Sequence, residues 1–321
     1  MNRHRSLVLV LLAFFASATL FGAERHDYGI LLLAHGGAER WNDSVAELAR
    51  GIDADVPTEV AFGMAQRSAM QPAIDRLQAR GVERIVAVPL FVSSHSSVIT
   101  STEYLLGLRE TAPPQLEQFA RMSHGHGGGH GHGDEHAAAA DPTSPVVASV
   151  PVTMTKALDG HPIAAEILLS RVASLSSDPA EEVVIVVAHG PVSNEDNEKW
   201  LADIGSLAEH MRGAGTFHRI EYMTVRDDAP EPIRSQATVE LRARVEKAAA
   251  EGKRVVIAPL LISYGGIERG IQKRLEGLEY AMPAEGLLPD ERLATWVRVM
   301  AEGSRTDAGA TVTAHHDAAH H

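Results

Sequence analysis

Residues 30–36 read Ile-Leu-Leu-Leu-Ala-His-Gly, and residues 183–190 read Val-Val-Ile-Val-Val-Ala-His-Gly. An apolar run of this length that stops at glycine is typical of a strand buried on both faces, as in a parallel sheet. The histidine of each copy therefore lies at the carboxyl end of its strand, which is where open α/β sheets bind their ligands. A unit made of a strand, a His-Gly loop and a helix thus occurs twice in the chain.

The elements that we expect after each copy follow the same order. After the first copy these are a helix capped at Asn42, a strand at 58–63, a helix at 71–80 and a strand at 84–92. After the second copy they are a helix capped at Asn194, a strand at 219–225, a helix at 233–250 and a strand at 254–263. Strands and helices that alternate at these lengths predict βαβ units and parallel sheets.

The repeat predicts an α/β protein with two tandem, doubly wound parallel-sheet halves, residues 26–178 and 179–303, related by a pseudo-two-fold axis. A final helix is expected in each half, beginning near Pro162 in the first and near Asp290 in the second. With 321 residues, of which 45% are hydrophobic, the chain is long enough for two ordinary domains.

Net charge and cysteine content exclude several classes of protein. The formal net charge is −13, and no cluster of Lys and Arg appears, so a nucleic-acid partner is not expected. The absence of cysteine excludes a lipoprotein anchor, disulfides and cysteine-ligated iron–sulfur clusters.

Residues 1–23 resemble a secretory signal peptide, because Arg3 and Arg5 precede a short apolar core that is followed by small residues. We therefore expect an exported protein, periplasmic or extracellular, without stable membrane insertion after cleavage. The alternatives are an uncleaved membrane anchor, or a wrongly assigned start, in which case the protein is cytoplasmic.

Residues 123–141 form a glycine-rich segment without hydrophobic periodicity, which predicts a disordered insertion. Imidazole suits borderline divalent cations, so this segment predicts loose capture of metal, the alternative being a solvated linker. Its histidines are His124, His126, His130, His132 and His136. The tail, residues 304–321, is also expected to be disordered, and its His315, His316, His320 and His321 are either a second capture segment or an artificial addition.

Two further histidines follow neighbouring strands of the first half, His35 after the strand at 30–34 and His95 after the strand at 84–92. Both should therefore reach the same edge of one parallel sheet. His189 joins them if the two halves face each other across a cleft. Imidazole is a base near neutrality and a metal ligand, so these side chains are candidates for both roles.

The second half lacks a counterpart of His95. When Pro89 is aligned with Pro259, Gly265 falls opposite His95, and Glu268 is the nearby acid available to complete the site. The expected site is therefore asymmetric.

His161 directly precedes the helix that we expect from Pro162. A helix N-terminus disfavours a cationic imidazole. We therefore expect a neutral His161 that caps the helix or supports a metal ligand.

Three motifs together resemble the sirohydrochlorin cobaltochelatase family, the class II tetrapyrrole chelatases. They are Ala34-His35-Gly36, Val88-Pro89-Leu90-Phe91-Val92-Ser93-Ser94-His95, and Leu158-Asp159-Gly160-His161-Pro162 before a helix. The resemblance covers residues 28 to about 302 as two tandem copies, similar to the long, internally duplicated form.

The resemblance implies two four-stranded halves enclosing a cleft, in which His35 and His95 bind the incoming divalent metal and accept the pyrrole protons. It implies a metal chelatase, a lyase of cobalamin biosynthesis, acting on a sirohydrochlorin-type tetrapyrrole and a metal ion. Co²⁺ is the first expectation, with Ni²⁺ or Fe²⁺ as alternatives, and no organic cofactor is expected. His189 and Glu268 would assist the metal, and the protein would be a monomer or a weak dimer.

A second class remains open, an exported non-enzymatic protein that binds metal or tetrapyrrole on the same fold. A histidine phosphatase is not expected, because an arginine should precede the histidine and both copies have alanine. The chain also lacks a Gly-x-Ser-x-Gly elbow and the common glycine-rich phosphate loops.

Overall fold

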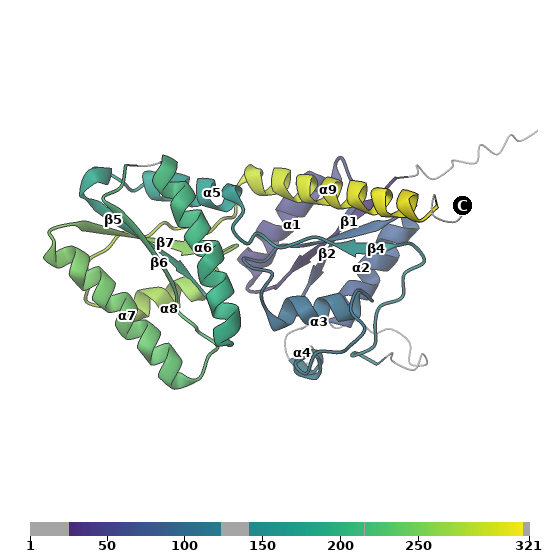
Figure 1. Cartoon of the computed structure of the whole chain (residues 1–321), viewed down its shortest axis with the longest axis horizontal. Coiled ribbons are helices and arrows are strands. Elements are labelled where there is room, and N and C mark those ends of the chain that lie inside the picture. Colours follow the sequence, from purple (N-terminus) through teal and green to yellow (C-terminus); the bar gives the residue numbers. More distant parts are fainter. Residues whose placement is uncertain (1–25, 123–140, 215, 317–321) are drawn as a thin grey trace, which may run out of the picture.

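The computed structural model describes residues 26–122, 141–214 and 216–316, and side chains as far as residue 304 (Figure 1). The expected signal peptide and the histidines of the 123–141 segment lie outside the described residues, as do the four histidine side chains of the tail. None of the helices in the described ranges has the length and apolar character that a bilayer crossing requires.

The first sheet has four parallel strands in the order β2-β1-β3-β4. The strands are β1 (Gly29–Ala34), β2 (Thr58–Phe62), β3 (Ile85–Pro89) and β4 (Val152–Met154). The helices of this part of the chain are α1 (Glu39–Asp53), α2 (Arg67–Ala79), α3 (Ser97–Leu105), α4 (Leu116–Met122) and α5 (Pro162–Ala173). β4 is the fourth strand that the family resemblance implies for this half, but its position was not predicted from the sequence, and neither were α3 and α4.

The second sheet is parallel with the order β6-β5-β7. Its strands are β5 (Glu182–Ala188), β6 (Arg219–Thr224) and β7 (Arg254–Leu260), preceded by the short helix η1 (Pro179–Glu181). Its helices are α6 (Asn194–Ala214), α7 (Glu231–Ala250), α8 (Ile267–Arg274) and α9 (Glu291–His316). The α/β fold with two tandem parallel sheets is confirmed.

The expectation of four strands in each half is wrong for the second sheet. A fourth strand is reduced there to one parallel bridge between Val256 and Ala281. Pro283 follows two residues later and has no N–H to donate to a neighbouring strand, which limits any extension of that pairing.

Alternate residues of each central strand point into different apolar cores. Ile30 and Leu32 of β1 join a core that also contains Val184 and Val186 of β5, so one core reaches the inner faces of both sheets. Leu31 of β1 belongs instead to a core on the outer face of the first sheet. The outer face of the second sheet has a third core, beneath α7 and α8. Because side chains alternate between the two faces of a strand, one set of residues packs in the core that the halves share, and the other set packs in the outer core of its own sheet.

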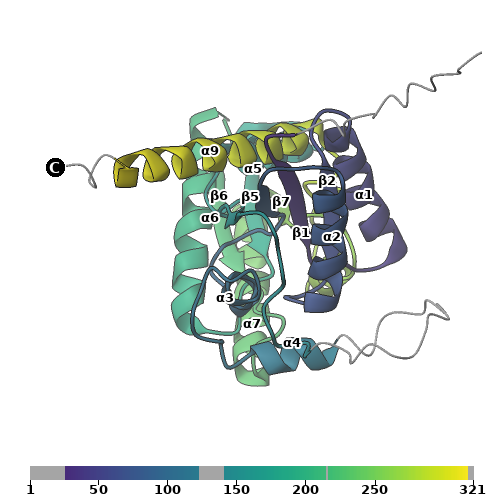
Figure 2. The same cartoon turned by 90° about the vertical axis from the view of Figure 1, so that its right-hand side faces the viewer.

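The final helices of the two halves are exchanged between the sheets. Helix α9 packs against α1 and β3 of the first sheet, whereas α5 packs against α6 and β7 of the second (Figures 1 and 2). Trp296 of α9 and Ile167 of α5 are both buried in the shared core. The physical reason is that each inner sheet face needs a second helix to cover it, and the helix of the other half supplies that cover.

The predicted disordered tail is also corrected in part. Helix α9 continues to His316, so residues 304–316 are helical, and only 317–321 lie outside the described backbone. A helix already nucleated by packing can extend because each added residue gains a backbone hydrogen bond.

Two tryptophans make reciprocal contacts between the halves. Trp200 of α6 donates from Nε1 to the backbone oxygen of His95 at 2.7 Å. Trp41 of α1 packs on Gly265, where an added β-carbon would lie 3.2 Å from the indole. Because Gly265 aligns with His95, each half places a tryptophan against the same loop of the other, as a pseudo-two-fold arrangement requires.

Glu182, at the start of β5, is a buried carboxylate that joins the crossover from α5 to the second sheet. It is 1% exposed, and it accepts hydrogen bonds from Ser176 Oγ at 2.5 Å, Ser177 N at 3.0 Å and Arg254 Nη1 at 2.6 Å. Burial raises the pKa of Glu182, but the hydrogen bonds from these three residues outweigh burial and hold the pKa below its ordinary value.

We therefore predict that Glu182→Gln lowers the free energy of unfolding by about 2 kcal/mol near neutral pH. The folded-state pKa is depressed, so this stabilisation is present above the unfolded pKa and is lost as the pH falls through the folded value. Urea unfolding from pH 7 downward should show the difference between wild type and variant shrinking in acid. A difference that is constant with pH would contradict this role.

Candidate functional site

Each of the two repeated His-Gly loops uses its glycine in a left-handed conformation, with φ of 77° at Gly36 and 76° at Gly190. Such an angle strains any residue with a side chain. At Gly190 an added β-carbon would also lie 2.5 Å from Cβ of Thr224. The glycine therefore turns the chain sharply at the end of the strand and leaves the preceding histidine at the sheet edge.

His35 lies on this edge with an exposed side chain. Its Nδ1 is 2.6 Å from the backbone oxygen of Gly36. A carbonyl oxygen only accepts, so Nδ1 carries the proton and Nε2 is left with the lone pair that a metal or a pyrrole proton needs.

The loop that carries His95 is fixed by Asp159, which precedes α5. The Asp159 carboxylate accepts hydrogen bonds from the backbone N–H of Ser94 at 2.5 Å and from its hydroxyl at 2.9 Å. The Ser93 hydroxyl accepts from the His95 backbone N–H at 3.1 Å. Because β1 and β3 are neighbours, the loops that carry His35 and His95 follow adjacent strands of the first sheet.

The His95 side chain faces the second half. Its Nε2 is 3.8 Å from Oδ2 of Asp203 on α6, and the imidazole is 39% exposed. Burial raises the pKa of Asp203, as does the charge of Asp159, while His95 and Lys156 act in the opposite direction. Asp203 was not among the site residues predicted from the sequence. Its position could have indicated a role, because it lies one turn after Trp200 and next to Ile204, which are both on the buried face of α6.

His189 lies at the equivalent edge of the second sheet, but its nearest acid comes from its own half. Its Nε2 is 3.3 Å from Oδ2 of Asp228, in the loop after β6. In the same loop, Arg226 is buried and donates to the backbone oxygens of Pro191 and Val192, both at 2.6 Å. This arginine thus holds the His-Gly loop of the second half.

Glu268 is 8% exposed, and its Oε2 accepts from the backbone N–H groups of Gly265 and Gly266 at 3.2 and 2.8 Å. Its Oε1 lies 3.5 Å from Arg269. One oxygen of this carboxylate is therefore committed to the turn that begins α8.

In the described part of the chain, no three His, Asp or Glu side chains lie close enough together to hold a metal ion. His35, His95, His189 and Glu268 are thus not assembled into a closed coordination site. A metal bound by one or two imidazoles would take its remaining ligands from water or from an incoming substrate.

His161 caps α5, as predicted. Its Nδ1 accepts from the backbone N–H of Ile163 at 3.2 Å, and burial lowers its pKa, which favours the neutral imidazole. The ring also meets Trp296 of α9 edge-on, at 6.5 Å between centroids. His161 is therefore part of the packing around the exchanged helices.

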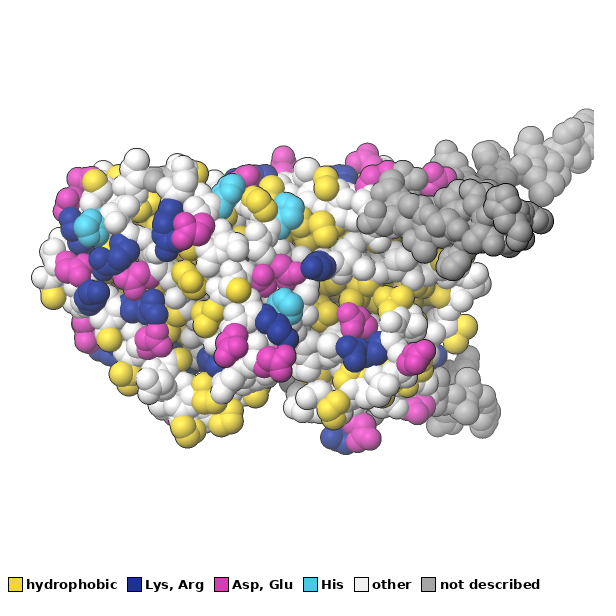
Figure 3. All heavy atoms as spheres, in the orientation of Figure 1, with side chains coloured by type: hydrophobic (Ala, Val, Ile, Leu, Met, Phe, Trp, Pro, Cys, Tyr) yellow, Lys and Arg dark blue, Asp and Glu magenta, His cyan; other side chains and the backbone are white. Residues whose placement is uncertain are grey.

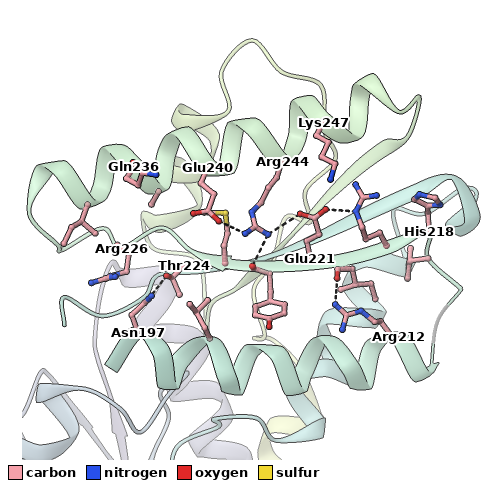
Figure 4. A pocket seen from close by; sticks show the side chains of 18 residues that line it. Asn197, Arg212, His218, Glu221, Thr224, Arg226, Gln236, Glu240, Arg244 and Lys247 are labelled. Carbon is pink, nitrogen blue, oxygen red and sulfur yellow. Dashed lines mark hydrogen bonds and ion pairs between the residues drawn. The ribbon is translucent and has the colours of Figure 1, made fainter. Parts of the chain in front are cut away.

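A groove of about 970 Å³ lies along the outer edge of β6 between α6 and α7, and none of these histidines lines it (Figure 4). Its charged lining residues are Arg212, Arg219, Arg226, Arg244, Lys247, Glu221 and Glu240. Basic and acidic side chains also lie interspersed on the surface of the second half (Figure 3). Arg212 and Arg244 donate to the backbone oxygens of Ile220 and Tyr222, at 2.5 and 3.3 Å, and so cover carbonyls of an edge strand.

Comparisons with known proteins agree with this architecture. The family model CbiX matches residues 29–175. A structure of SirB from Bacillus subtilis with Fe³⁺ has 17% sequence identity and a TM-score of 0.56, covering 88% of this chain and 98% of that one. The sirohydrochlorin chelatase SirB from Bacillus subtilis subspecies spizizenii, in complex with cobalt, has 15% identity and a TM-score of 0.51, covering 86% and 96%. A search of curated proteins finds no match.

The two-sheet fold is similar to that of the SirB structures, over most of this chain. The part of the chain that matches the CbiX family model is its first half.

We predict that Arg244→Ala lowers the free energy of unfolding by about 1–3 kcal/mol. The variant removes a donor 3.2 Å from the mostly buried Glu221 carboxylate, and it uncovers the Tyr222 carbonyl. Urea denaturation would measure the loss, and sedimentation would detect any association through the opened edge.

The control is Arg234→Ala. That arginine pairs with Glu231 on the exposed surface of the same helix, so its loss should change stability by about 0.5 kcal/mol or less. Equal effects of the two variants would show that the contacts of Arg244 over β6 contribute nothing to the free energy of unfolding.

Proposed function

We propose that this protein inserts a divalent metal ion into a sirohydrochlorin-type tetrapyrrole, with Co²⁺ as the first candidate and Ni²⁺ or Fe²⁺ as alternatives. The observation that carries the proposal is the parallel pairing of β1 with β3, the two strands after which His35 and His95 follow in the chain. The match of residues 29–175 to the CbiX family model supports it, and so does the likeness in fold to SirB structures that hold Fe³⁺ and cobalt.

The chemistry needs groups that both bind metal and accept protons. Insertion replaces two pyrrole N–H protons with one M²⁺ ion, so two protons leave as four nitrogen ligands form. Imidazole is suited to each task. In the proposed reaction, Nε2 of His35 offers a lone pair toward solvent, and His95 is the second base and ligand.

A site in which the protein supplies only some of the metal's ligands favours transfer of the ion to the tetrapyrrole over its storage. With one or two imidazoles on the metal, the other positions hold exchangeable water, which pyrrole nitrogens can displace stepwise. A closed site of four protein ligands would instead retain the ion. This is consistent with the absence of any three-residue ligand group among the described residues.

We assign supporting roles to the other predicted ligands. His189, from the equivalent edge of the second sheet, and Glu268 would assist the metal in the cleft. The five histidines between 124 and 136 would capture metal at low concentration and raise its local supply. The N-terminal sequence leads us to propose export, and we propose a monomer or weak dimer.

The second candidate is an exported protein that binds metal or tetrapyrrole without turnover. The signal-peptide pattern and the two histidine-containing segments favour it. Tetrapyrrole binding without faster metal insertion would identify this function.

We predict that His35→Ala lowers the rate of Co²⁺ insertion into sirohydrochlorin by 100-fold or more, because one residue supplies both a ligand and a base. The assay follows absorbance with purified mature protein against the uncatalysed rate. His218→Ala is the control, since this exposed histidine lies at the β6 groove, and it should retain wild-type turnover. Wild-type turnover by the His35 variant would refute the assignment.

We also predict that deletion of residues 123–141 slows insertion only at low metal concentration. A capture segment raises local metal supply without altering the reacting groups. Titration of Co²⁺ at fixed tetrapyrrole should show a higher KM for metal and an unchanged kcat. A lower kcat at saturating metal would place the segment in the reaction itself.

A further inference from the structure

The two histidines of the first half are held differently. The His35 imidazole contacts the backbone of its own loop through Nδ1. The His95 imidazole instead faces a carboxylate of the other half, Asp203 on α6, and the same helix anchors the His95 backbone through Trp200. Trp200 and Asp203 are one helical turn apart, so both face the His95 loop from one side of α6.

The pseudo-two-fold axis provides an internal comparison. On the other side of the interface, Trp41 of α1 packs on Gly265, which aligns with His95. The residue three positions after Trp41 is Ser44, and its hydroxyl donates to the backbone oxygen of Arg40 at 2.9 Å. The carboxylate is therefore present where the opposing loop carries an imidazole and absent where that loop carries glycine.

Asp203 is also unusual in its own surroundings. Its Oδ2 is buried and accepts no hydrogen bond, although a buried carboxylate oxygen normally requires a donor. The nearest ring nitrogen is Nε2 of His95, at 3.8 Å, which is too long for a hydrogen bond. A side-chain movement of about 1 Å would bring the two atoms into range. Lys156 and Asp159 are the other charged groups that act on this carboxylate.

We propose that Asp203 positions His95 across the interface and fixes its tautomer, with the proton on Nε2 toward Asp203 and the lone pair on Nδ1 presented to the metal. This role concerns the same site as the proposed function, and its purpose depends on that function. A carboxylate behind a ligating imidazole orients the ring and makes it a stronger ligand. The second half, which lacks a counterpart of His95, thereby contributes to the metal-binding edge of the first.

The test reads the tautomer directly. Long-range ¹H–¹⁵N spectra of the full chain at pH 8, with the His95 signals assigned by their loss in His95→Ala, should show a protonated Nε2 and an unprotonated Nδ1. In Asp203→Asn this preference should be reduced or reversed. In Glu209→Gln, which alters an exposed carboxylate on the same helix, it should be unchanged.

Insertion kinetics provide the second readout. Loss of a carboxylate behind a metal ligand costs about 10–100-fold in metal affinity or activity, so Asp203→Asn should raise the KM for Co²⁺ by that factor, with a smaller change in kcat. The thermal midpoint should not fall, because the variant neutralises a carboxylate whose buried Oδ2 lacks a hydrogen-bond donor. A lower midpoint with unchanged tautomer and unchanged KM would show a purely structural residue and overturn the proposal.

The two hypotheses fail in different ways. If the wild type inserts no metal but the His95 tautomer depends on Asp203, the proposed function fails and the positioning role stands. If the wild type inserts metal and Asp203→Asn matches it in tautomer and KM, the function stands and the positioning role is wrong.

Discussion

One apolar core that reaches the inner faces of both sheets is the constraint on which the rest of this structure depends. The residues of β1 and β5 that point inward share it, and α9 and α5 complete it by packing on the half to which they do not belong in sequence. Neither sheet could bury its inner face without the helix of the other. The halves are thus held together by hydrophobic burial, which is the dominant favourable term in folding.

That constraint places the strand-end histidines. Because α6 joins the shared core, Trp200 reaches the His95 loop and Asp203 stands opposite the imidazole. In the reciprocal contact, Trp41 packs on Gly265, so no imidazole stands at that position. The halves are thus related in shape, while the pair of imidazole and aspartate occurs on one side of this interface.

The edge of the second sheet shows how the fold limits unwanted pairing. Among the described residues, β6 has one strand neighbour, and arginines from α6 and α7 donate to two of its outward carbonyls. The arginines of the groove there are bound to glutamates and backbone oxygens, whereas the imidazole of His35 is exposed.

The sequence by itself determined the strands other than β4, the duplication, the His-Gly turns and the capping role of His161. These features depend on local periodicity and on residues within one turn of each other. Only the tertiary structure decided that α5 and α9 are exchanged, that the second sheet has three strands, that Glu268 binds its own turn, and that Asp203 faces His95. His95 and Trp200 are 105 residues apart, and an aspartate on an amphipathic helix is indistinguishable from a surface residue until the opposing loop is in place. Such contacts depend on how whole layers pack, and no local pattern encodes that arrangement.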